Sequence, residues 1–176
     1  NLGLFYGMGK AKLQAELGVS KDKAEELFTI YHERVPFVKT LMNSVSNRAQ
    51  QRGQIRTLLG RLCRFHLWEP SQFGIHKALP FGEARQEYGA SIRRAYTYKA
   101  LNKLIQGSAA DMTKKSMLEL YKEGIVAHIQ VHDELDISVE DDIKAKRIKE
   151  IMESAVELEI PNKVDYESGK NWGEIR

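Results

Sequence analysis

The feature that most strongly constrains the fold of this chain is a pair of alternating apolar runs with an acidic tripeptide between them. The tripeptide His132-Asp133-Glu134 stands between residues 125–131 and 135–139, where apolar side chains recur at every second position. Such a period is typical of strands, so the pattern predicts a strand, a tight turn and a second strand. The turn lacks the Asn-Gly or Asp-Gly pair that hairpins favour and carries two carboxylates and an imidazole instead. We interpret it as a functional turn.

The carboxylates of this turn predict metal chemistry. Carboxylate oxygens suit hard cations such as Mg²⁺, and a strand turn holds them rigidly. The turn offers the carboxylates of Asp133 and Glu134. A two-metal site for phosphoryl or nucleotidyl transfer needs at least two bridging carboxylates, and only one stands in a convincing position here. Taken alone, the tripeptide is equally compatible with a solvated turn.

Length and composition bound the class of protein. A chain of 176 residues, 42% hydrophobic and 29% charged, can bury a core and fits one domain or parts of two. No run approaches the roughly 20 apolar residues needed to span a bilayer, and no signal-peptide pattern is present. The single cysteine, Cys63, excludes an internal disulfide and is compatible with a reducing compartment.

The net charge of +3 conceals an asymmetry along the chain. Between Arg48 and Lys103 there are eleven Lys or Arg and three Asp or Glu, which gives +8. Between Glu119 and Arg176 there are eight against fifteen, which gives −7. A basic middle predicts contact with phosphates, and an acidic end predicts carboxylates near a cation, although two solvated faces would give the same counts.

Periodicity and turn residues predict the order of elements. The expected elements are helices over 20–34 and 36–51, a hairpin within 54–65, an irregular segment over 66–90, helices over 91–122 and 142–158, and a closing strand at Val164 and Tyr166. Because the strands are few and late, the order predicts an α+β fold with a small antiparallel sheet.

The helix expected over 91–122 carries a polar stripe. Tyr98, Asn102 and Gln106 recur at four-residue spacing and so share one helix face. Side-chain amides can donate to the purine N3 and pyrimidine O2 acceptors that line every minor groove of DNA. Gly107 and the alanines after it would let another backbone or a ligand come close. Ordinary polar exposure of a helix is the alternative interpretation.

Four blocks in this order resemble DNA polymerases of family A, the bacterial DNA polymerase I type, in a phage-like form. They are the segments 1–9 (NLGLFYGMG), 57–61 (TLLGR), 102–111 (NKLIQGSAAD) and 130–134 (QVHDE). The first resembles the second half of motif B in the fingers, and the last resembles motif C in the palm. The match covers nearly the whole chain.

The resemblance implies roles for the acidic turn. Asp133 would ligate the two catalytic Mg²⁺ ions, Glu134 would support the metals and the primer terminus, and His132 would contact the primer end. The implied reaction is template-dependent nucleotidyl transfer, in which the primer 3′-hydroxyl attacks the α-phosphate of a dNTP and pyrophosphate leaves.

The resemblance also implies contacts to nucleotide and DNA. Leu2, Tyr6 and Gly7 would lie at the incoming nucleotide and the templating base, and Leu2 stands where the family usually has Phe or Tyr, which should alter sugar discrimination. The DNA contacts implied by the resemblance come from Arg61, Tyr98, Asn102 and Gln106. Many relatives have Arg at the position of Tyr98. Arg61 is expected to contact the phosphate backbone of the DNA. Such contacts position the protein on the duplex but do not read its base sequence.

The implied domains are distal fingers over 1–52, a fingers–palm junction and loop over 53–97, and palm over 98–176. The chain begins with Asn1, and we expect the segment with motif A and the first half of motif B to lie upstream of it. That upstream fragment, primer-template DNA and dNTP are the expected partners, with no membrane. We therefore expect the isolated chain to be inactive, and a cytoplasmic location (host cytoplasm if the gene is viral). The rival hypotheses are a non-catalytic module that binds duplex DNA and, less well supported, a metal-dependent phosphohydrolase.

Overall fold

The computed structural model describes residues 2–5, 8–72, 74 and 76–175. It divides into two compact units, Asn1–Gly107 and Ser108–Arg176. The division falls inside the long helix α6 (Ala100–Lys122), so each unit holds a part of that helix. Both units combine helices with short antiparallel strands, which confirms the predicted α+β class.

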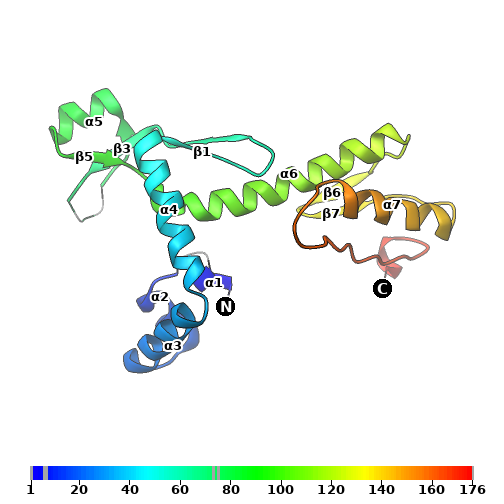
Figure 1. Ribbon diagram of the computed structural model, residues 1–176, viewed down its shortest axis with the longest axis horizontal. Coiled ribbons are helices and arrows are strands. Elements are labelled where there is room, and N and C mark those ends of the chain that lie inside the picture. The colour runs from blue at the N-terminus through cyan, green and yellow to red at the C-terminus, as the bar shows by residue number, and fades with distance from the viewer. Residues whose placement is uncertain (1, 6–7, 73, 75, 176) are drawn as a thin grey trace. The chain divides into compact units, whose positions relative to one another are not determined.

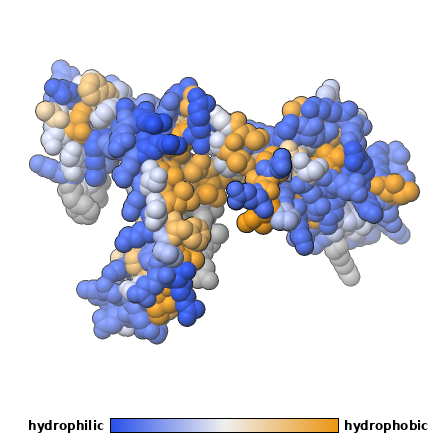
Figure 2. Space-filling view, in the orientation of Figure 1, coloured by the Kyte–Doolittle hydropathy of each residue, from blue (hydrophilic) through white to orange (hydrophobic). Residues whose placement is uncertain are grey.

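Unit 1 opens with helices whose ends follow the expected signals. Its helices are α1 (Leu2–Phe5), α2 (Lys10–Leu17), α3 (Lys21–Arg34), α4 (Pro36–Arg52), α5 (Phe81–Tyr88) and the 3₁₀ turn η1 (Thr97–Lys99). Ser20 caps α3, because its hydroxyl accepts from the backbone N–H of Lys23 at 3.2 Å. Pro36 begins α4 and Gly53, with φ of 68°, ends it. Both predicted helices are confirmed, and the α2–α3 pair presents mostly hydrophilic residues in Figure 2.

The predicted hairpin is also confirmed, with β1 (Gln54–Arg56) paired antiparallel to β2 (Leu62–Arg64). It lies beside α4, and the two share the core of unit 1 (Figure 1). The buried residues of this core are Val45, Ala49, Ile55, Phe65 and Ala100. Because the first turn of α6 contributes Ala100, the hairpin and α6 are fixed to the same core.

The prediction that residues 66–90 form an irregular segment was wrong. Strand β3 (Leu67–Pro70) pairs with β4 (Leu79–Pro80) on one side and with β5 (Ile92–Arg94) on the other, and α5 follows β4 directly. The Arg94 guanidinium stacks on the Trp68 ring at 4.5 Å, and it donates to the carbonyl oxygens of Gln50 and Phe65 at 3.2 and 3.0 Å. These contacts join segments distant in sequence, which a local pattern does not reveal.

The start of the long helix also differs from the prediction. Residues 92–94 form β5, η1 follows, and α6 begins at Ala100 rather than near residue 91. Tyr96 precedes η1 with φ of 61°, so the chain changes direction there and the two segments are not one helix.

Unit 2 is built on the second part of α6. Its other elements are β6 (Ile129–Val131), β7 (Glu134–Asp136), α7 (Asp142–Ser154) and the 3₁₀ turn η2 (Trp172–Glu174). The hairpin predicted around the acidic tripeptide is confirmed. Leu120, Ile125, Ile148 and Ile151 form the buried core, and Leu135, Ile137 and Met152 pack against it.

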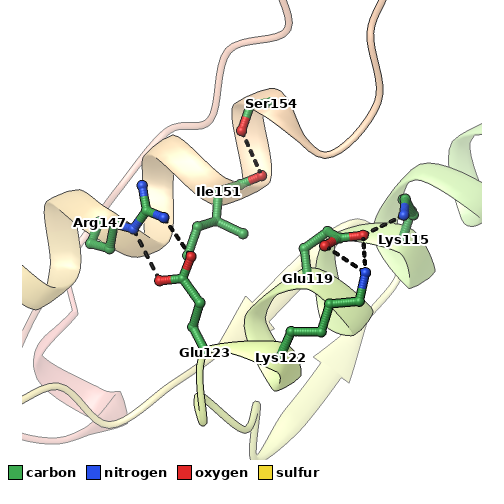
Figure 3. A network of polar contacts seen from close by, with 7 residues as sticks. All are labelled: Lys115, Glu119, Lys122, Glu123, Arg147, Ile151 and Ser154. Atoms are coloured by element: carbon green, nitrogen blue, oxygen red, sulfur yellow. Dashed lines mark hydrogen bonds and ion pairs between the residues drawn. The ribbon is translucent and has the colours of Figure 1, made fainter.

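Ion pairs hold the end of α6 against α7 and bridge one turn of α6 to the next. The Arg147 guanidinium donates to both carboxylate oxygens of Glu123, and Glu119 accepts from Lys115 and Lys122 (Figure 3). The hydrogen bond from Arg147 lowers the pKa of Glu123, and those from Lys115 and then Lys122 lower the pKa of Glu119. Both carboxylates are therefore ionised more readily in the folded chain.

The C-terminal expectations were wrong in two places. Helix α7 ends at Ser154 rather than near 158, and the structure assigns no strand at Val164 or Tyr166, because residues 155–171 hold no helix or strand. The backbone N–H of Val164 donates to the Glu153 carboxylate at 3.0 Å, so this segment is tied to α7 instead of to a strand. Among the described residues, no helix is both long and apolar enough to cross a membrane.

Candidate functional site

The acidic turn of unit 2 is a two-residue connection. Val131 pairs with Glu134, so His132 and Asp133 alone join β6 to β7. His132 adopts the left-handed region with φ of 53°, which two-residue hairpin turns require at their first central position and which Asn or Gly usually supplies. The side-chain amide of Gln130 donates to the carbonyl oxygen of His132 at 2.6 Å. A side chain of β6 therefore holds the peptide group between His132 and Asp133 in place.

Strand pairing assigns the side chains of the hairpin to two faces. Ile129 pairs with Asp136 and Val131 with Glu134, so these four side chains share one face. Leu135 lies on the opposite face and packs against the core of unit 2. Ile129 and Val131 are 45% and 41% exposed and Glu134 is exposed, so this face is open beside the turn, whereas Asp136 is half-buried at its other end.

The acidic residues line a groove within unit 2. Asp133, Glu134 and Asp136 contribute to the walls of this groove, which has a volume of about 950 Å³. The residues that line it from α6 are Ala109, Met112, Thr113 and Ser116. The Oδ2 atom of Asp136 is buried and has no hydrogen-bond partner among the described residues. Three carboxyl groups therefore stand along the hairpin wall of the groove, and Lys149, Lys163 and Lys170 also line it.

The turn supplies donors for a metal ion, but not a full set. Asp133 and Glu134 are both exposed and present carboxylate oxygens, the ligand type that Mg²⁺ prefers. Within the described ranges, no three His, Cys, Asp or Glu side chains converge where they could hold a metal ion. The donor chemistry of these two carboxylates fits Mg²⁺.

Unit 1 holds the second group of predicted site residues. Asn102 and Gln106 lie four residues apart on α6 and share a face. Gln106 is exposed, whereas the Oδ1 atom of Asn102 is buried and finds no partner within the described part of the chain. Tyr98 lies in η1 before the helix, so it does not continue the stripe as expected, and its ring is exposed.

Arg61 contacts the same helix. Its Nη2 donates to the carbonyl oxygen of Gly107 at 2.7 Å. Gly107 follows Gln106 directly in α6. The methyl group of Thr57 covers Gly107 from the same hairpin turn, 2.8 Å from where a Cβ would stand. The close approach at Gly107 therefore comes from side chains of the β1–β2 turn, whereas the sequence predicted the approach of another backbone or a ligand.

Three predicted residues receive no side-chain description. Tyr6 and Gly7 lie outside the described residues, and for Leu2 the structure gives only its backbone in α1. Their predicted roles stay predictions.

Sequence reasoning gave no role to Gln130 or Thr57. Gln130 alternates with apolar neighbours in a strand, which looks like an ordinary solvent-facing position. Gln130 and Thr57 each open a block that resembles a family motif, and that was the only signal available for either of them.

Comparison with known proteins defines the class. Residues 1–174 match the family described as DNA polymerase family A. The chain is 32% identical over 98% of its length to a DNA-directed DNA polymerase of Pseudomonas phage M6, and 34% identical over 98% of its length to DNA polymerase I of Bacillus caldotenax. The chain belongs to DNA polymerase family A.

A solved structure has a similar fold. The POL domain of Pol1 from M. smegmatis, in complex with DNA primer-template and dNTP, superposes with a TM-score of 0.68 at 28% identity and covers 91% of this chain. The chain spans 27% of that protein, 28% of the phage polymerase and 19% of the Bacillus enzyme.

Proposed function

We propose that this chain is the distal fingers and palm part of a DNA-directed DNA polymerase that adds dNTPs to a primer 3′-hydroxyl. The observation that carries this proposal is the position of Asp133 on a two-residue turn between β6 and β7, in a chain of family A. The likeness to a polymerase domain complexed with primer-template and dNTP supports the substrate class.

Asp133 and Glu134 would hold Mg²⁺ through their carboxylates, and His132 beside them would contact the primer end. The bound ions would activate the primer hydroxyl and stabilise the leaving pyrophosphate. Gln130 would keep the peptide before Asp133 in place while the carboxylate binds. The open face of the hairpin leaves room beside Asp133 for the reacting groups.

A further acidic segment would complete this site. The described residues bring too few ligands together for two ions, so we propose that motif A, from an upstream polymerase segment, supplies the second bridging carboxylate. The isolated chain would then lack polymerase activity. The same upstream segment would carry the cationic half of motif B, which holds the triphosphate.

Duplex DNA would lie against α6. Asn102 and Gln106 would donate to minor-groove acceptors without sequence preference, and Tyr98 would lie beside them. The basic stretch between Arg48 and Lys103 would supply the phosphate attraction. Leu2, Tyr6 and Gly7 would contact the nucleotide and the templating base. The protein would work in the cytoplasm.

Primer extension tests the proposal. The purified chain alone should add no nucleotide, and the chain mixed with an upstream polymerase segment that carries motif A should extend a primer in the presence of Mg²⁺. Extension by the chain alone would contradict the incomplete metal site. No extension by any mixture, together with firm duplex binding, would favour the rival hypothesis of a non-catalytic DNA-binding module.

A further inference from the structure

The carboxylate of Asp136 has one oxygen atom that is buried without a partner. Its Oδ2 atom is closed off from solvent and accepts no hydrogen bond from any of the residues that the structure describes. The side chain as a whole is half-buried, and it lines the groove of unit 2. Buried carboxylates in folded proteins are paired or hydrogen-bonded, because burial removes the water that would otherwise stabilise their charge. An oxygen atom in this position therefore indicates a partner that binds from outside the chain.

Asp136 lies on the face of the β6–β7 hairpin that the core of unit 2 does not use. It pairs across the strands with Ile129, and Val131 pairs with Glu134 on the same face, whereas Leu135 on the other face packs against the core. Ile129 and Val131 remain 45% and 41% exposed. A polypeptide segment that covered this face would remove both apolar side chains from water and could supply the partner of the carboxylate.

The lysines that line the groove leave Asp136 without a counter-charge. Lys149, Lys163 and Lys170 all contribute to the groove walls. Lys149 approaches the carboxylate of Glu153 instead, with 3.9 Å between its Nζ and the Oε1 atom. None of the three donates to the buried oxygen atom of Asp136 within the part of the chain that the structure describes. The groove therefore has a place for a cation from another polypeptide segment.

We propose that Asp136 forms a buried ion pair with a lysine or arginine of the upstream polymerase segment, and that this ion pair holds the segment on the β6–β7 hairpin. The inference rests on the proposed function, in which a segment with motif A completes the site. The chain spans 28% of the phage polymerase and 19% of the Bacillus enzyme, so these relatives contain a large part that could carry such a cation.

The chemistry of this position selects a cationic protein side chain over DNA. The phosphates of DNA carry the same sign of charge as Asp136, so they would be repelled from its carboxylate. Asp136 follows Glu134 by two positions in β7, which corresponds to about 7 Å along a strand. An ion pair at that distance from the acidic turn would fix the position of the second acidic segment relative to the first.

Binding of the upstream segment tests the ion pair. We would measure the dissociation constant between the full chain and the upstream polymerase segment used for primer extension, by isothermal titration calorimetry. Asp136→Asn keeps the shape of the side chain and removes its charge. It should weaken association about thirtyfold or more, because the partner cation would be left buried and unpaired. Asp165→Asn is the matched control, since Asp165 is exposed and lines the same groove, and it should change the dissociation constant by less than about twofold.

Thermal unfolding of the chain alone distinguishes this partner from a group within unit 2 and from a metal ion. Asp136→Asn should leave the thermal midpoint unchanged or raise it, because it removes a buried charge that has no partner. A lower midpoint would show that a group of this chain already pairs with Asp136, and it would overturn the proposal. A rise of the midpoint with added MgCl₂ that the wild-type chain shows and Asp136→Asn loses would assign the position to a metal ion, which would also overturn it.

A double-mutant cycle identifies the partner cation. Each Lys or Arg of the upstream segment is replaced by Met, and one replacement should weaken binding to the wild-type chain but not to Asp136→Asn. Absence of any such position, or equal binding of the wild-type chain and Asp136→Asn, would overturn the ion pair and leave the proposed function standing if the mixture extends a primer. A wild-type chain that neither binds the upstream segment nor extends a primer with it would reject the proposed function, and the ion pair would fall with it.

Discussion

The Gln130 side chain donates to the carbonyl oxygen of His132 at 2.6 Å and so spans the turn that carries Asp133. His132 holds φ of 53°, a conformation that costs a non-glycine residue energy and persists only when its surroundings impose it. The strained backbone of His132 and the hydrogen bond from Gln130 that restrains it therefore both lie next to Asp133, the proposed metal ligand.

Removal of this restraint should slow catalysis. Gln130→Ala leaves the His132 carbonyl without its partner, so the carboxylate of Asp133 should sample more positions. We expect single-nucleotide incorporation by the reconstituted polymerase to fall about tenfold, since small misplacements of a reacting group are costly. Gln51→Ala, an exposed position on α4, is the control. Equal rates for the two variants would show that the hydrogen bond has no part in catalysis.

His132 should lower the stability of the fold while it contributes to nucleotide incorporation. His132→Gly removes the penalty for a left-handed residue, so the free energy of unfolding of the chain should rise by up to about 1 kcal/mol. Nucleotide incorporation should fall, because the imidazole proposed to touch the primer end is lost. Denaturant unfolding and primer extension measure the two effects. A less stable His132→Gly variant would indicate that no strain is stored at this turn.

Acid should weaken unit 2 through its ion pairs. The pKa values of Glu119 and Glu123 are lowered in the folded chain, so their contribution is present above the ordinary glutamate pKa of about 4.3 and is lost as the pH falls through the folded values. The thermal midpoint should therefore drop as the pH is lowered below about 4.3, and Glu123→Gln should flatten this dependence. Glu167 is exposed and has no ion pair within the described residues, so Glu167→Gln should leave the pH dependence of the thermal midpoint unchanged.

The stacked arginine of unit 1 should matter for stability. Arg94 lies over the Trp68 ring and bonds two backbone carbonyls, so Arg94→Ala removes a cation–π contact and two charged hydrogen bonds. We expect a loss of about 2–4 kcal/mol in the free energy of unfolding. Arg85→Ala, on the exposed side of α5, should cost under about 0.5 kcal/mol in the same measurement.

Local signals predicted those elements whose causes are local. The cap at Ser20, the proline at the start of α4 and the alternation around the acidic turn each act within a few residues, and the structure has these elements where expected. The β3–β5 pairing depends on contacts between residues more than twenty positions apart, and short strands with prolines resemble loops. For the same reason, Gly107 indicated a close approach, but its partner Arg61 could not be foreseen.

The replacement of Asp133 tests the central claim most directly. With the upstream polymerase segment present, Asp133→Ala should reduce Mg²⁺-dependent primer extension by at least about a thousandfold. Its affinity for the primer-template duplex should stay within about twofold of the wild-type value, because the proposed minor-groove contacts of Asn102 and Gln106 lie on α6 and not on the acidic turn. Primer extension at the wild-type rate by the Asp133→Ala variant would contradict the account.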